Sequence, residues 1–144
     1  MSRWFFIAVV GIFFSVAVNA AQVGLIKIDG AIGPATANYI ARAIDVAANQ
    51  EDECLVIEMN TPGGLANSMD DIVQDFYASR VPVVVYVSPE GAMAGSAGVY
   101  ITLAADIAAM APHTTIGAAH PVELGNEGET TNSIMMQKIG NAYT

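Results

Sequence analysis

Residues 54–64 read Cys-Leu-Val-Ile-Glu-Met-Asn-Thr-Pro-Gly-Gly, a mostly apolar run that ends in a glycine turn. The run from Cys54 to Met59 predicts a strand, because it is short, apolar and bounded by turn residues. Neither a strand nor a helix tolerates the sequence from Asn60 to Gly64, so we expect a tight loop there. Cys54 is therefore expected to be a buried strand residue, and Asn60 to shape the turn.

A helix is expected after this loop. Ser68 and Asp71 form the S-x-x-D capping signature, which is typical of a helix N-terminus. The helix is therefore predicted from about Ser68 to Ser79. Its apolar positions recur at helical spacing: Met69, Ile72, Val73 and Phe76.

Strands and helices alternate on both sides of the loop, which predicts an α/β fold with a mostly parallel sheet and crossover helices. Pro34 opens a helix whose apolar face is expected to pack on the sheet. That face consists of Tyr39, Ile40, Ala43, Ile44 and Ala47. The other expected elements are strands at Val23–Asp29 and Val81–Val87, a helix at Ser96–Ala105, apolar segments at Ile107–Ala111 and Thr114–Ala118, a surface loop at Val122–Asn132 and a helix from Ser133.

The first twenty residues have the pattern of a signal peptide. Arg3 precedes an uncharged stretch from Trp4 to Val18, and small residues stand at positions 18 and 20. The alternative is an uncleaved anchor, although the apolar stretch is shorter than the ~20 residues that usually span a bilayer. Either interpretation places one domain, residues 21–144, outside the cytoplasm. The chain stops inside the last expected helix, which suggests the front of a longer protein.

Composition excludes several classes of function. The 144 residues are 53% hydrophobic and 13% charged, with five Lys and Arg, fourteen Asp and Glu and a net charge of -9. No basic cluster could neutralise a phosphate backbone, so nucleic-acid binding is not expected. The single cysteine permits neither an internal disulfide nor a zinc cluster, and no metal or other cofactor is expected.

Two glycine turns concentrate the candidate chemistry. The first ends at Gly64, and the second places Ser96 at the start of a helix, followed by Ala97. Ligands of open α/β sheets collect where strands end and helices begin, because the first N–H groups of a helix are free. Ser96 could act as a nucleophile, with the N–H groups of Gly64 and Ala97 forming an oxyanion hole. Either turn alone could simply allow close helix packing, whereas the two together favour a catalytic site.

A serine nucleophile needs a base, and few are available. Lys27 lies within the first expected strand and is expected to face solvent, and His113 follows Pro112 in an expected turn. His120 remains a candidate. Lys138 stands among apolar residues, and such a setting lowers the pKa of a lysine toward the range that a base requires. A lysine on the wet face of an amphipathic helix is the alternative interpretation.

Four strings in this order resemble the N-terminal domain of the NfeD family, the stomatin operon partner proteins. They are Asn60–Gly64, Gly95–Tyr100, Ala104–Asp106 and Ile116–Pro121. The resemblance covers essentially all of the mature chain and implies a ClpP/crotonase-like fold and a membrane-bound serine protease, distantly related to signal peptide peptidase A. It implies that Ser96 is the nucleophile, Lys138 its dyad base, and Gly64 and Ala97 the oxyanion positions.

The resemblance also implies partners and location. It implies an endopeptidase that cleaves hydrophobic stretches, with a stomatin-like membrane protein as substrate or partner, and a homodimer or larger assembly. Full-length members carry transmembrane helices, and many add a small β-barrel domain. Together with the N-terminal segment, this implies a membrane-anchored protease domain on the extracytoplasmic face of the membrane. If such elements are missing here, an apolar face of the fold is expected to lie uncovered.

Three alternatives remain open at this stage. His120 precedes a proline, as the ClpP histidine does, so Ser96 and His120 could form a Ser-His pair with an acidic third member. Asp70, Asp71 and Asp106 are more simply interpreted as carboxylates near helix ends. A crotonase-like acyl-CoA enzyme would need a carboxylate base near the cleft. A protease-like scaffold would bind a partner without doing chemistry.

Overall fold

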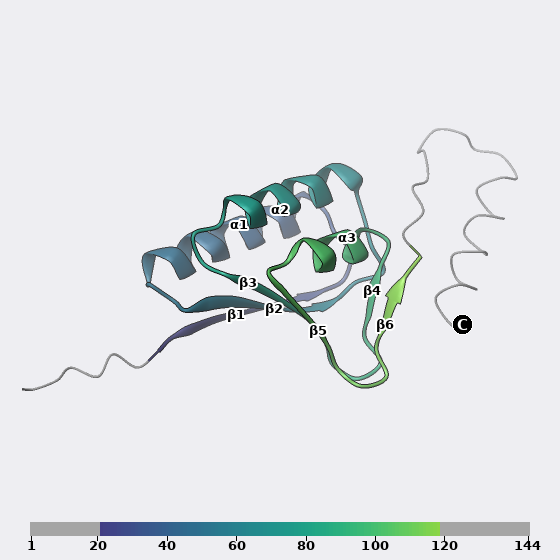
Figure 1. Cartoon of the computed structure of the whole chain (residues 1–144). Helices are drawn as coiled ribbons and strands as arrows, with labels where there is room; N and C mark the ends of the chain where they lie inside the picture. Colours follow the sequence, from purple (N-terminus) through teal and green to yellow (C-terminus); the bar gives the residue numbers. More distant parts are fainter. Residues whose placement is uncertain (1–20, 119–144) are drawn as a thin grey trace, which may run out of the picture.

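A four-stranded parallel sheet forms the centre of the described part of the molecule, and the helices of this part lie on one face of the sheet (Figure 1). The computed structural model describes residues 21–118. The strand order is β1-β2-β3-β5, with β1 at Val23–Asp29, β2 at Cys54–Asn60, β3 at Val83–Val87 and β5 at Ile107–Met110. The crossovers contain α1 at Pro34–Asn49, α2 at Ala66–Ala78 and α3 at Ala97–Ala104. The predicted α/β architecture with crossover helices is confirmed.

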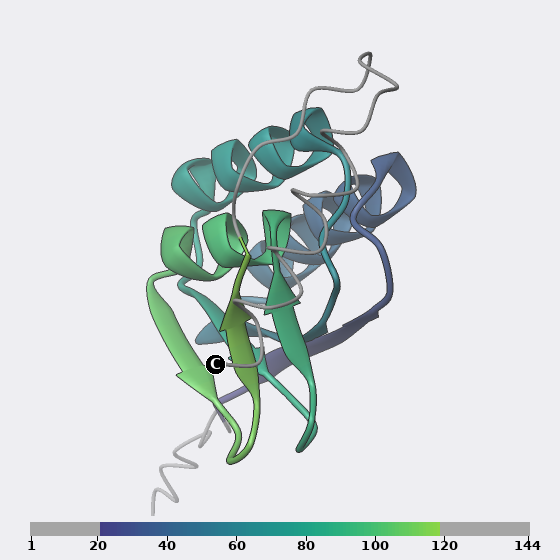
Figure 2. The same cartoon turned by 90° about the vertical axis from the view of Figure 1, so that its right-hand side faces the viewer.

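A second, smaller sheet leads into α3. It pairs β4, Met93–Gly95, in parallel with β6, Thr115–Gly117. Figure 2 shows the two strands side by side below α3. Sequence patterns did not predict β4, because three residues of Met-Ala-Gly carry no periodic signal of their own.

The core lies between the sheet and its helices. Alternate residues of β2 and β3 are buried, as expected for strands with one covered face. The buried face of α1 consists of Ala37, Ile40, Ile44 and Ala47. The prediction that Tyr39 belongs to this face was wrong: its side chain is 41% exposed, because Ala37 takes the position next to Ile40 that faces the sheet.

Two other local predictions need correction. Helix α2 begins two residues earlier than the capping signature predicted, with Leu65 as N-cap and no capping side chain. The glycine turn feeds directly into the helix, so Ser68 is buried inside it and Asp71 stands beyond the first turn. Cys54 is only half-buried, because it lies on the same face of β2 as Val56, which no helix of residues 21–118 covers.

The second face of the sheet carries no helix from residues 21–118 (Figure 1). Leu25, Val56, Val84 and Ile107 are in register across the four strands on this face. Leu25 and Ile107, on the two edge strands, are strongly exposed. Residues 21–118 by themselves therefore leave an apolar strip of the sheet uncovered.

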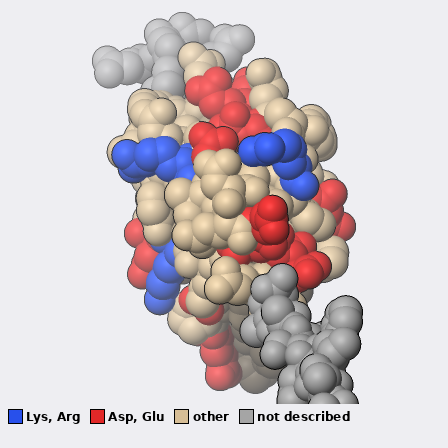
Figure 3. Space-filling view, turned by 90° about the vertical axis from the view of Figure 1, so that its left-hand side faces the viewer, with Lys and Arg blue, Asp and Glu red and all other residues tan. Residues whose placement is uncertain are grey.

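Charged side chains are scattered over the surface, and few of them are basic. The basic residues of the described part are Lys27, Arg42 and Arg80, from β1, α1 and the α2–β3 connection. Figure 3 shows one face of the molecule, on which separate blue basic groups and red acidic groups are interspersed among tan residues. Within residues 21–118 no helix is long and apolar enough to cross a bilayer. The predicted signal peptide, the loop at 122–132 and the helix from Ser133 lie outside the described residues.

Candidate active site

The two glycine turns meet at the carboxyl edge of the sheet. The first connects β2 to α2, and the second connects β4 to α3. Thr61 bridges Ala94 in parallel, donates its N–H to the Met93 carbonyl at 2.7 Å and accepts the Gly95 N–H at 2.9 Å. Turns more than thirty residues apart in the sequence are therefore held together by backbone hydrogen bonds.

Ser96 adopts a strained conformation at the strand-to-helix turn. Its φ of 49° and ψ of -111° lie outside the regions that a residue with a Cβ normally adopts. Such strain costs of order 1–3 kcal/mol and persists only where the surroundings enforce it. Here the Ser96 N–H donates to the Gly117 carbonyl at 3.0 Å, and the Ser96 carbonyl accepts the Val99 N–H at 3.0 Å. A half-buried serine on a sharp, strained turn before a helix has the geometry of a nucleophile elbow.

The Pro62–Gly64 turn is pressed against this serine. A Cβ added to Gly63, whose φ is +116°, would stand 2.6 Å from the Ser96 Cβ and 3.2 Å from its Oγ. No larger residue could occupy this position without moving Ser96. The absence of a side chain at Gly63 is therefore what brings the two turns into direct contact.

The loop between β1 and α1 also packs against the Pro62–Gly64 turn, a contact that the sequence analysis did not predict. The Ile32 N–H donates to the Gly63 carbonyl at 2.8 Å, and the Ile32 carbonyl accepts the Leu65 N–H at 3.0 Å. A Cβ on Gly64 would stand 1.9 Å from the Ile32 oxygen. The signal that could have found this contact is the second glycine, because only Gly64 permits a backbone to approach so closely.

Within residues 21–118, two backbone N–H groups of the paired turns, those of Gly64 and Ala97, are not used in backbone hydrogen bonds. Hydrogen bonds of the turn use the Gly63 carbonyl and the Leu65 N–H, and the Gly64 N–H is not among their donors within residues 21–118. Ala97 is the first residue of α3, where an N–H has no acceptor within the helix. The arrangement can therefore offer two donors to a negatively charged oxygen near Ser96.

The structure brings together only part of the predicted site. Ser96, Gly64 and Ala97 gather at one edge, whereas Lys138 and His120 lie outside the described residues. Lys27 is exposed on β1, as expected.

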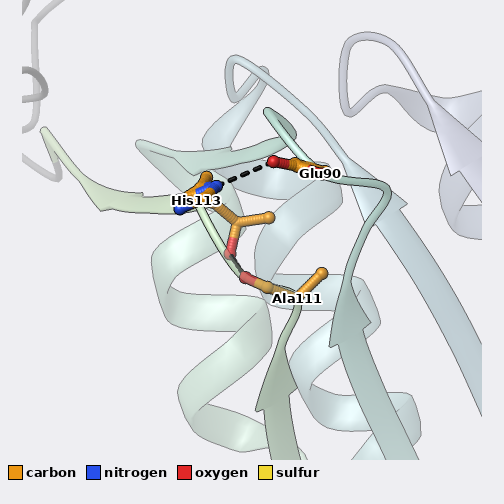
Figure 4. A network of polar contacts seen from close by, with 4 residues as sticks. Glu90, Ala111 and His113 are labelled. Atoms are coloured by element: carbon orange, nitrogen blue, oxygen red, sulfur yellow. Dashed lines mark hydrogen bonds and ion pairs between the residues drawn. The ribbon is translucent and has the colours of Figure 1, made fainter.

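His113 does not serve this site. It lies in the turn before β6, at the opposite end of that strand from the Gly117 carbonyl that contacts Ser96. Its Nδ1 is 2.7 Å from Glu90 Oε1, and both side chains are more than 70% exposed (Figure 4). The same figure includes Ala111, whose carbonyl accepts a 2.6 Å hydrogen bond from the Thr114 hydroxyl. These contacts stabilise a surface turn, and His113 is not close to Ser96.

Two carboxylates of the described residues, Asp106 and Asp75, lie away from Ser96. Asp106 accepts the Val83 N–H at 2.8 Å, at the amino end of β3. Burial raises the pKa of Asp75, and the nearby charges of Asp71 and Asp45 raise it further. Asp75 is nine residues into α2, which places it roughly 13 Å along the helix from the catalytic edge. Neither Asp106 nor Asp75 is therefore placed to act as the carboxylate base that a crotonase-like reaction would need. Residues 21–118 contain no cluster of metal-ligating side chains.

The Asn60 side chain links the ends of β1 and β2 to the start of β4. Its Nδ2 donates to Asp29 Oδ1 at 3.0 Å, and its Oδ1 accepts the Met93 N–H at 3.0 Å. The Asn60 side chain was expected to shape its own turn, and these hydrogen bonds show that it links β2 to β1 and β4.

Removing this amide should loosen the edge of the sheet. For Asn60→Ala we expect the free energy of unfolding to fall by about 1–2 kcal/mol, because two hydrogen bonds are lost and the Met93 N–H loses its acceptor. Urea denaturation of the two proteins measures this difference. Asn38→Ala, on the exposed side of α1, is the matched control and should change stability little. Equal losses in the two variants would contradict the assigned role of Asn60.

Comparison with known proteins identifies the family. A family model described as the N-terminal domain of NfeD1b matches residues 22–143. The chain belongs to this NfeD family. It is 45% identical over 96 residues to the membrane-bound protease PH1510 of Pyrococcus horikoshii, and 30% identical over 119 residues to membrane protein NfeD1b of Bacillus subtilis. These matches cover 67% and 83% of the chain, but only 22% and 26% of the two relatives.

Solved structures match the fold closely. One is a serine-to-alanine variant of the 1510-N membrane-bound stomatin-specific protease, with a TM-score of 0.69 at 35% identity over 85% of this chain and 62% of that one. Another is a lysine-to-alanine variant of the same protease in complex with a substrate peptide, with a TM-score of 0.73 at 34% identity over 87% and 60% of the two chains. The ClpP-like fold expected for this NfeD domain is confirmed.

Proposed function

We propose that this NfeD domain is a serine endopeptidase in which Ser96 is the nucleophile and Lys138 the general base. The strained Ser96 turn, in contact with Gly63 and flanked by two available N–H groups, is the observation that carries the proposal. The names of the related structures support it, because a serine and a lysine were chosen for substitution in a protease.

In the proposed mechanism, neutral Lys138 accepts the Ser96 proton while Oγ attacks the scissile carbonyl. The N–H groups of Gly64 and Ala97 hold the oxyanion, which collapses to an acyl-enzyme and releases the amine. Lys138 then activates the water that hydrolyses the ester. Because the donors are backbone groups on packed turns, they need no reorganisation as negative charge develops.

The proposed substrates are hydrophobic segments of membrane-associated, stomatin-like proteins. The related structures are described as a stomatin-specific protease, and the two relatives are named as membrane proteins. We further propose that the domain works on the extracytoplasmic face as a homodimer or larger assembly. If the serine does no chemistry, the same surface would act as a scaffold that only binds such a partner.

The identity of the base is tested by comparing Lys138→Ala with His120→Ala. For Lys138→Ala we expect kcat/KM on a hydrophobic peptide panel to fall by about 10³-fold or more, because the Ser96 hydroxyl loses its proton acceptor. His120→Ala should retain most activity. The matched control is Lys27→Ala, which removes an exposed lysine from β1. The reverse pattern, with His120→Ala inactive and Lys138→Ala active, would replace the Ser-Lys dyad by a ClpP-type Ser-His pair.

A further inference from the structure

Thr61 is a fully buried polar residue whose hydroxyl contacts the glycine turn. The residue has 0% exposure. Its Oγ1 accepts the Gly63 N–H at 3.1 Å and donates to the Gly63 carbonyl at 3.3 Å. Both polar groups of Gly63 are therefore tied to one side chain, which closes the turn from inside the protein.

These contacts set the plane of a specific peptide group. The Gly63 carbonyl and the Gly64 N–H belong to the same planar peptide bond and point in opposite directions in its trans form. The carbonyl accepts two hydrogen bonds, one from the Thr61 hydroxyl and one from the Ile32 N–H at 2.8 Å. Holding the carbonyl on one side therefore fixes the direction of the Gly64 N–H on the other.

Thr61 also contacts the turn that carries the nucleophile. Its backbone pairs with Met93 and Gly95 on β4, one residue before Ser96. A Cβ added to Gly98 in α3 would stand 2.6 Å from the Thr61 Cγ2. The backbone, the methyl group and the hydroxyl of one residue thus touch β4, α3 and the Pro62–Gly64 turn.

We propose that Thr61 is a positioning residue whose hydroxyl orients the Gly63–Gly64 peptide so that the Gly64 N–H faces the oxyanion formed at Ser96. The inference rests on the proposed protease function. In addition to the proposed catalytic residues, the inference assigns a role to a buried side chain that affects the rate of hydrolysis through the Gly64 N–H, without contact with the substrate. A glycine pair is flexible by itself, and the Gly63 φ of +116° has to be enforced by its surroundings. The Thr61 hydroxyl supplies that constraint together with Ile32.

The test compares variants of the full-length chain in hydrolysis of a hydrophobic peptide. Thr61→Val keeps the shape of the side chain and removes the hydroxyl. We expect its kcat to fall about 10- to 100-fold with KM nearly unchanged, because a misdirected donor weakens transition-state binding alone. Thr61→Ser keeps the hydroxyl and loses the methyl group, so it should retain kcat within about threefold while its melting temperature falls.

Ser79→Ala is the matched control for loss of a local hydroxyl bridge. Ser79 Oγ makes the same pair of contacts with Val81, at 2.6 and 3.2 Å, in the connection that enters β3 at its amino end. Its removal should lower stability without changing kcat. Rates are normalised to the folded fraction measured by circular dichroism at the assay temperature. If Thr61→Val does not fold, the kcat of Thr61→Ser is compared with that of Thr61→Ala. These two variants differ only in the hydroxyl, so a lower kcat in Thr61→Ala supports the inference and equal values contradict it.

Two results would overturn the inference. One is a Thr61→Val kcat within twofold of wild type. The other is an equal loss of kcat in Thr61→Ser and Thr61→Val, which would assign the effect to any change of packing at this buried position and not to the hydroxyl. A different result would show that the proposed protease function itself is wrong. In that case wild type and Ser96→Ala would cleave the peptide at the same rate, whichever residue occupies position 61.

Discussion

Ser96→Ala is expected to abolish peptide hydrolysis while the protein keeps its fold and its ability to bind peptide. Without the hydroxyl no acyl-enzyme can form, and kcat/KM should fall by about 10⁴- to 10⁶-fold. Alanine keeps the Cβ that packs against Gly63 and the strained backbone at φ 49°, so the free energy of unfolding should hardly change. Hydrolysis of a hydrophobic peptide and binding of the same peptide, both with purified protein, measure the two effects.

The contrast between binding and hydrolysis separates an enzyme from a scaffold. Ser79→Ala, a serine at the amino end of the sheet, is the matched control and should cleave as wild type does. Retained binding with lost hydrolysis is the expected result for a protease. If Ser96→Ala hydrolyses the peptide as fast as wild type, Ser96 is not the nucleophile and the scaffold interpretation replaces the proposed function.

Gly64→Ala is expected to disrupt both the site and the local fold. The new Cβ would stand 1.9 Å from the Ile32 oxygen and 2.6 Å from its nitrogen, and both neighbours are backbone atoms that no rotamer change can move. One of the two chain segments must shift, which breaks the hydrogen bonds between Ile32 and the turn. We expect the free energy of unfolding to fall by about 3 kcal/mol or more, with loss of hydrolysis.

Gly33→Ala provides the matched control one residue beyond the same contact. Gly33 is extended, with φ -156°, and a Cβ there meets no atom within 4 Å. Its stability should stay within about 1 kcal/mol of wild type, because only the N-cap preference of α1 changes. Urea denaturation compares the three proteins. Equal stability of Gly64→Ala and wild type would contradict a close backbone contact between Gly64 and Ile32.

Local patterns predicted most of the elements correctly. The limits of β1 and the start of α1 at Pro34 follow from an apolar run and from a proline whose missing N–H is not needed in the first turn. The alternation of strands and helices required a parallel sheet, since parallel strands need crossovers. Predictions failed where the surroundings compete with a local signal, as at Ser68, whose capping signature is overridden by a turn that already leads into the helix.

The residues of the candidate site likewise divide into those that the sequence predicted and those that it did not. Ser96, Gly64 and Ala97 could be singled out from sequence because a glycine turn before a helix predicts free N–H groups. Thr61 and Ile32 could not, because their roles depend on contacts with residues distant in the sequence, such as the β4 backbone for Thr61 and the Pro62–Gly64 turn for Ile32. Strand β4 escaped detection for the same reason, as its three residues are a strand only because they pair with β6 and Thr61.

The sequence by itself determined which residues can form strands, helices and turns, because the spacing of apolar side chains and the backbone limits of proline and glycine act over a few neighbouring residues. Only the tertiary structure decided the backbone conformation and the contacts of Ser96. Its strained φ and its contact with Gly63 arise from hydrogen bonds to Gly117 and from the meeting of two turns. A residue holds such a conformation only when packing from several segments makes every alternative more costly.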